Sequence, residues 1–112
     1  MITVLFHMSV KQERLDEFLK IAKTMTGTTR SQDTGCITYT FLHQADEPTK
    51  AVLFEQWASP EDLNNHVARL VRDMGPPGQD EALPPTHHRR RLPESFFSLF
   101  NETEAVRYDV LS

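Results

Sequence analysis

His66 is the side chain of this sequence best suited to move a proton. A neutral histidine with a pKa of about 6.5 accepts a proton at neutral pH, so it can act as a general base. His66 follows Leu63 by three residues and precedes Leu70 by four, and helical spacing therefore puts it at the edge of an apolar stripe. It should face the sheet or its margin. The alternative is a half-buried histidine that hydrogen-bonds a backbone carbonyl and takes no part in chemistry.

Glu55 and Trp57 lie at the end of an apolar run shortly before His66. A carboxylate among apolar residues needs a partner or a role, because an unpaired buried charge is costly. For Glu55 we expect a hydrogen bond to the neighbouring helix or to a second copy of the chain rather than catalysis. Trp57 shares a strand face with Glu55 and Leu53, where it would either wall a cavity or pack beneath the start of the next helix.

Tyr39 and His7 are the remaining candidates, each within another strand-like run. Tyr39 could donate a hydrogen bond to a substrate oxygen, with core packing as the alternative. His7 is mid-strand, where both ring nitrogens must be satisfied, and it is either a site residue or a structural one. No two histidines or carboxylates have the spacing of a helical zinc motif, and His87 and His88 lie beside three arginines. We therefore predict no metal ion.

The elements that must hold these side chains follow from hydrophobic periodicity. Alternation predicts a strand over residues 2–10, and a stripe at helical spacing predicts a helix that begins near Lys11 and ends before Gly35. β-Branched and aromatic runs predict a hairpin of strands over 37–42 and 51–57. Ser59 caps a second helix that stops at Gly75, and an irregular proline-rich loop follows over about 75–86. A short third helix begins at Pro93, carries Phe96, Phe97, Leu99 and Phe100, and precedes a last strand over 105–111.

The order β-α-β-β-α-(α)-β predicts an α+β fold of the ferredoxin-like split β-α-β type, in one domain over residues 1–112. Its four-stranded antiparallel sheet should have helices on one face. The strand at 51–54 is apolar without alternation, and the strand at 37–42 has Tyr39 on one face and Leu42 on the other. Apolar residues on both faces require cover on both, and the chain's own helices can cover only one. We therefore predict a homodimer in which a second copy covers the other face.

Bulk properties exclude several classes of function. The chain has 112 residues with a formal net charge of -4, and its one basic run, at 87–91, is too short for a nucleic-acid footprint. No apolar run approaches the ~20 residues needed to cross a bilayer, so we expect no membrane interaction. Cys36 is the only cysteine, which rules out an internal disulfide and favours a cytoplasmic location.

Three short motifs resemble those of the antibiotic biosynthesis monooxygenase family, a group of dimeric α+β barrels. They are Gly35-Cys36-Ile37-Thr38-Tyr39, Phe54-Glu55-Gln56-Trp57, and the helix start from Leu63 to His66. The resemblance covers roughly residues 1–71 and the last strand, and is weaker over 72–92. It implies a monooxygenase that needs no cofactor and acts on a small aromatic, quinol or anthrone-like substrate. His66 would be the base, with Trp57, Tyr39, His7 and Glu55 around the substrate.

Two other functions remain open on the same fold. One is a dimeric protein that binds a small hydrophobic ligand without chemistry, and the other is a non-oxidative isomerase or lyase. A heme-degrading function is disfavoured within the resemblance. That branch carries an asparagine on the first strand and a second tryptophan, whereas the matching positions here are His7 and His66.

Overall fold

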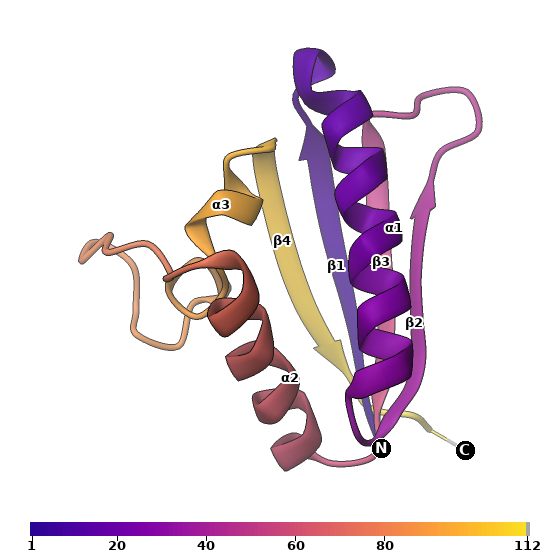
Figure 1. Ribbon diagram of the computed structural model, residues 1–112, viewed down its shortest axis with the longest axis vertical. Helices are drawn as coiled ribbons and strands as arrows, with labels where there is room; N and C mark the ends of the chain where they lie inside the picture. Colours follow the sequence, from indigo (N-terminus) through magenta and orange to yellow (C-terminus); the bar gives the residue numbers. More distant parts are fainter. Residues whose placement is uncertain (112) are drawn as a thin grey trace.

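The protein folds as a four-stranded antiparallel sheet packed against helices. The computed structural model describes residues 1–111 (Figure 1). The strands are β1 (Ile2–Val10), β2 (Cys36–His43), β3 (Lys50–Trp57) and β4 (Phe100–Tyr108). The helices are η1 (Gln12–Arg14), α1 (Leu15–Gln32), α2 (Pro60–Met74), η2 (His88–Arg90) and α3 (Glu94–Phe97). The sheet order is β2-β3-β1-β4, so the predicted ferredoxin-like α+β fold is confirmed.

Two boundaries differ from the prediction at the C-terminal end of the chain. The last strand begins at Phe100 and ends at Tyr108, whereas alternation predicted 105–111. The third helix is correspondingly short, so Leu99 and Phe100 follow it instead of lying on it. Val10 of β1 pairs with Phe100, and this main-chain pairing draws the phenylalanine into the sheet despite its helix-like spacing from Phe96 and Phe97.

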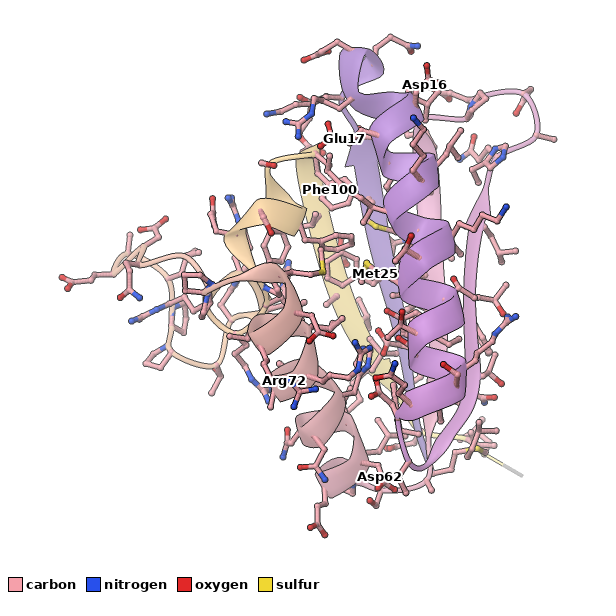
Figure 2. All side chains as sticks on the ribbon, in the orientation of Figure 1. Asp16, Glu17, Met25, Asp62, Arg72 and Phe100 are labelled. Carbon is pink, nitrogen blue, oxygen red and sulfur yellow. The ribbon has the colours of Figure 1, made fainter. Side chains whose placement is uncertain are left out.

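The core lies between the sheet and the helices. Inward-facing Phe6, Met8, Leu53 and Trp57 form one buried cluster with residues of all three α-helices, namely Phe18, Met25, Leu63, Leu70, Phe96 and Phe97. Figure 2 shows Met25 and Phe100 pointing into the space between α1 and β4, while Asp16 and Arg72 point outward. Each helix and the sheet therefore bury one face in this core, as amphipathic elements must.

Burial alternates along β3. Ala51, Leu53, Glu55 and Trp57 are buried, and the residues between them are only half-buried. In the single chain α1 and α2 cover only the inner side of this strand, as the sequence predicted, and cover of the outer side by a second copy stays a prediction. The outer face carries half-buried Leu5, Val52 and Phe54 beside Leu42, which is 54% exposed.

Local backbone chemistry fixes where α2 begins and ends. The Ser59 hydroxyl accepts a 3.1 Å hydrogen bond from the Asp62 backbone N–H, and Pro60 occupies the first helical position. The helix ends at Gly75, whose φ of 103° suits glycine. Gly35, at φ 81°, lets the turn between α1 and β2 approach α2 closely, because a Cβ there would collide with the Asp62 side chain. The end of α1 is thereby brought against α2.

The proline-rich segment after α2 is tied to the rest of the molecule at its two ends. Pro77 and Pro93 form an isolated antiparallel bridge, and the Glu94 N–H donates to the Pro76 carbonyl at 3.0 Å. Within the segment, Arg90 donates to the Leu83 carbonyl at 2.9 Å. The segment therefore leaves and rejoins the fold at nearly the same point.

Candidate active site

His66 is enclosed by side chains from β2, β3 and the end of α1. It lies on the inner face of α2 and is 2% exposed. The Trp57 ring packs at 4.6 Å with an interplanar angle of 34°, and the Tyr39 ring meets it edge-on at 5.2 Å. Its Nδ1 atom lies 2.6 Å from the Oδ2 atom of Asp33 at the end of α1. The partner of the ring is thus a carboxylate and not the backbone carbonyl of the alternative interpretation.

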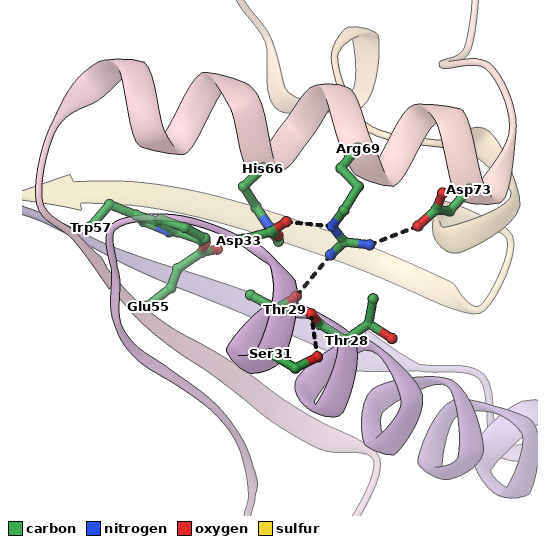
Figure 3. Close-up of polar contacts among 9 residues, drawn as sticks. All are labelled: Thr28, Thr29, Ser31, Asp33, Glu55, Trp57, His66, Arg69 and Asp73. Carbon is green, nitrogen blue, oxygen red and sulfur yellow. Dashed lines mark hydrogen bonds and ion pairs between the residues drawn. The ribbon is translucent and has the colours of Figure 1, made fainter.

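Asp33 contacts both His66 and Arg69, a second buried residue of α2 (Figure 3). The Nε atom of Arg69 donates to the other Asp33 oxygen, Oδ1, at 2.5 Å. The two remaining guanidinium nitrogens donate to Asp73 at 2.8 Å and to the hydroxyl of fully buried Thr29 at 3.1 Å. Three polar contacts therefore connect the end of α1 to the middle of α2, and a fourth, from Arg69 to Asp73, lies within α2.

The ionisation of this group follows from its surroundings. Burial raises the pKa of Asp33, but the hydrogen bonds from Arg69 and His66 outweigh it and the pKa is lowered overall. Burial lowers the pKa of His66 more than Asp33 raises it. At neutral pH the carboxylate is therefore ionised and the imidazole is neutral.

Glu55 is buried in β3 with a partner on its own strand. The carboxylate accepts a 2.8 Å hydrogen bond from the Trp57 indole nitrogen, and the residue is 7% exposed. The expected bond to the neighbouring helix is not the one formed. Burial raises the pKa of Glu55 to about 7, although the bond from Trp57 opposes the shift. Near neutral pH this group exists in both protonation states.

Tyr39 has a buried hydroxyl that makes no hydrogen bond within residues 1–111, although the Thr29 side chain is near enough to lower its pKa slightly against the effect of burial. Tyr39 is 1% exposed. Burial, with a contribution from the nearby Glu55 carboxylate, raises its pKa well above the ordinary value. The hydroxyl therefore stays protonated and is available as a donor.

A cavity of about 470 Å³ lies beside these three polar groups. Tyr39, Glu55 and His66 all line it, and most of the remaining wall is apolar, including Val4, Phe6, Leu53, Val67, Leu70 and Leu92. The proline-rich segment and β4 complete the wall with Thr86, Arg91 and Arg107. An apolar hollow with a few convergent polar groups is typical of a small-molecule site.

Two of the residues predicted around the substrate lie elsewhere. Trp57 has no exposed surface and packs behind His66 instead of lining the cavity. His7 is exposed, on the opposite side of β1 from Phe6, and it lines a different hollow together with Leu42, Lys50 and Val52. The structure therefore brings His66, Tyr39 and Glu55 together and leaves His7 apart from them.

Asp33 and Arg69 were missed by sequence reasoning. One signal was present for Arg69, because it follows His66 by three residues and precedes Asp73 by four, so all three lie along one side of the helix. Asp33 gave no such signal, since an aspartate between a helix and a glycine usually faces solvent.

Comparison with known proteins places the chain in a family. A family model described as antibiotic biosynthesis monooxygenase matches residues 1–72, which is more than half of the chain. The chain belongs to the antibiotic biosynthesis monooxygenase family. The matched residues include Tyr39, Glu55 and His66. No curated protein matches the chain.

Solved structures agree with the family at the level of the fold. An antibiotic biosynthesis monooxygenase superposes with a TM-score of 0.66 at 18% identity, over 100% of both chains. A conserved protein from Methanosarcina mazei gives 0.67 at 23% identity, over 96% of this chain and 89% of that one. Rv0793 from Mycobacterium tuberculosis gives 0.68 at 18% identity, over 99% of this chain and 95% of that one. At such identities the likeness is one of architecture.

Two further findings bear on the class of site. Among residues 1–111, no three histidine, cysteine, aspartate or glutamate side chains converge as a metal site would require. In the same part of the chain, every helix is too short or too polar to cross a membrane.

Proposed function

We propose that this family member is a cofactor-independent monooxygenase acting on a small aromatic, quinol or anthrone-like substrate. One observation carries the proposal: neutral His66 and the unpartnered hydroxyl of Tyr39 line the same mostly apolar cavity. An aromatic ring would occupy the apolar part. Its acidic hydrogen would then meet a base, and its oxygen would meet a donor.

His66 would remove the acidic proton of the substrate, and Tyr39 would stabilise the oxyanion that forms. The electron-rich anion can then reduce oxygen directly. In an anthrone, the reacting carbon loses two hydrogens and gains a carbonyl oxygen, while the second oxygen atom leaves as water. The substrate supplies all of the electrons, so the reaction balances without a cofactor.

Oxygen consumption tests this function. Purified protein would be given anthrone and naphthohydroquinone, with spontaneous oxidation subtracted using buffer and boiled protein. The expected result is enzyme-dependent uptake of labelled oxygen into the product, reduced by about 10²-fold or more in His66→Ala, because one positioned base contributes roughly that much. Full activity in His66→Ala on an accepted substrate would show that another group is the base.

The proposed enzyme is also a homodimer. The outer sheet face presents Leu5, Leu42, Val52 and Phe54 without cover from the described residues, and adjacent Tyr108 on β4 is 45% exposed. A second copy would bury this face in an isologous interface. We infer a cytoplasmic location from the single cysteine, because secreted proteins of this size often carry disulfides.

A non-oxidative isomerase or lyase is the second candidate, and Glu55 is the observation that favours it. Its pKa of about 7 and the neutral His66 give one cavity two groups able to exchange protons near neutral pH. Such a pair suits the transfer of a proton between two substrate carbons. Turnover under strict anaerobic conditions would favour this reaction over oxygenation. Ligand-induced thermal stabilisation with no turnover in either condition would favour a binding protein.

A further inference from the structure

Asp33 bridges the proposed base and a fixed cation. One of its oxygens lies 2.6 Å from Nδ1 of His66, and the other accepts from Nε of Arg69 at 2.5 Å. The side chains of all three residues are at most 8% exposed. Arginine has only donors and an ionised carboxylate has only acceptors, so the direction of each bond is determined. The proton between His66 and Asp33 must belong to His66.

We propose that Asp33 is a positioning residue that keeps the proton of neutral His66 on Nδ1 and so leaves the Nε2 lone pair free to act as the base. The inference depends on the proposed function in one respect only, namely the substrate whose proton that lone pair would accept. Among residues 1–111, no hydrogen bond engages Nε2. Free imidazole can carry its proton on either nitrogen, and a base needs the nitrogen nearest the substrate to be bare.

Asp33 itself is held so that it can perform this role. It is the C-cap residue of α1, and its backbone N–H donates to the Thr29 carbonyl at 3.0 Å. Arg69 is fixed in turn by Thr29 and Asp73. The carboxylate therefore has little freedom to rotate away from the imidazole.

The charges of the cluster favour the neutral ring before reaction and tolerate the charged ring after it. Arg69 already supplies a positive charge to Asp33, and its proximity disfavours a second one on His66. When the ring accepts the substrate proton on Nε2, it becomes an imidazolium whose Nδ1–H still faces the carboxylate. Serine proteases use a buried aspartate in the same way, to fix the tautomer and stabilise the imidazolium.

Asp33→Asn provides a sharp test. The amide has the size of the carboxylate, but an NH2 donor replaces one of the two acceptor oxygens. Arg69 can only donate, so it needs the amide oxygen as its acceptor. The amide NH2 group is then left facing Nδ1 of His66. The ring can then satisfy this donor only by moving its proton to Nε2. Tautomers are distinguished by imidazole nitrogen NMR on labelled protein, with no substrate present.

The expected result is an Nδ1–H tautomer in the wild type and an Nε2–H tautomer in Asp33→Asn, with turnover lowered by about 10²-fold or more. Asp73→Asn is the matched control, because it removes a carboxylate that contacts Arg69 but not His66, and it should retain the Nδ1–H tautomer. A proton on Nε2 in the wild type would overturn the inference even if the asparagine variant fails to fold. An unchanged tautomer in folded Asp33→Asn would overturn it as well.

The tautomer test and the oxygen-uptake test can give opposite results, so the two proposals are judged separately. A tautomer switch in Asp33→Asn, with no oxygen uptake by the wild type on any quinol or anthrone, supports the positioning role and contradicts the oxygenase. Oxygen uptake with no switch contradicts the positioning role and supports the oxygenase.

Discussion

The indole nitrogen of Trp57 donates a 2.8 Å hydrogen bond to Glu55, its neighbour on the same face of β3. The bond explains how a carboxylate is accommodated in a strand face that is otherwise apolar. It satisfies one of the two carboxylate oxygens, Oε1, and the pKa of Glu55 is still raised to about 7. A buried acid of this kind should make the stability of the protein depend on pH.

Glu55→Gln should stabilise the protein in alkaline but not in acidic solution. The pKa is raised from 4.5 to about 7 on folding, so the folded state binds the extra proton between these values and wild-type stability falls as pH rises through about 7. Glutamine removes the charge, and the variant should gain up to about 3 kcal/mol in unfolding free energy near pH 8 but almost none near pH 4. Urea unfolding at both pH values measures this, with exposed Glu102→Gln as the control. An equal gain at both pH values would contradict the shifted pKa.

Tyr39→Phe should separate activity from stability. The buried hydroxyl has no partner among the described residues, so its removal should leave the unfolding free energy unchanged or raise it by roughly 1 kcal/mol. If the hydroxyl holds the substrate oxyanion, turnover should fall by about 10²-fold. Exposed Tyr108→Phe is the matched control for both measurements. Loss of stability without loss of turnover would mean that the hydroxyl has a structural partner instead.

Phe54→Glu should convert the proposed dimer to a monomer. The side chain lies on the outer face of the sheet, and twofold symmetry places the new charge in the interface twice. The dimer should weaken by about 10²-fold or more, because unpaired charges would be buried. Light scattering at micromolar concentration measures the mass. Leu19→Glu, on the exposed side of α1, should leave the dimer intact. A monomeric wild type would refute the dimer itself.

Gly35→Ala should be strongly destabilising, whereas Gly27→Ala should not be. At Gly35 the backbone has φ 81° and a Cβ would collide with Asp62, so alanine should cost about 2 kcal/mol or more. Gly27 lies inside α1 with nothing within 4 Å of the added carbon, and alanine there should gain roughly 0.5 to 1 kcal/mol. Thermal unfolding of the pair compares them directly. Equal effects would mean that the turn relaxes at no cost.

Periodicity in the sequence was sufficient to predict the fold. The alternation of β1, the stripe of α1 and the Ser59-Pro60 helix start are local signals, and each was found where predicted. Helical spacing also put His66 on an inner face, where it lies. These predictions succeeded because each depends on neighbours within one or two turns of chain.

The network around His66 could not be predicted in the same way. Asp33 is separated from His66 by 33 residues, and the two meet only because the turn at Gly35 brings the end of α1 against α2. The separation of His7 from His66 has a related cause. With apolar residues on both faces of the strands, the sequence did not show which face holds the cavity, and His7 lies on the other one.

The segment between the bridged residues Pro77 and Pro93 supplies part of the cavity wall. Tyr39, Glu55 and His66 come from residues 1–72, which match the family, whereas Thr86, Arg91 and Leu92 of the wall lie outside that match. The segment that carries them is also held between its ends, because His88 lies 2.9 Å from the Thr103 hydroxyl and Arg91 donates to Asn64 at 2.8 Å. Changes that keep the His88 and Arg91 contacts should therefore alter the cavity wall without touching Tyr39, Glu55 or His66. Grafting a relative's segment between Pro77 and Pro93 is a direct way to alter which molecules the site admits. Such a graft would change the wall that meets the ligand and leave the side chains proposed to handle the proton in place.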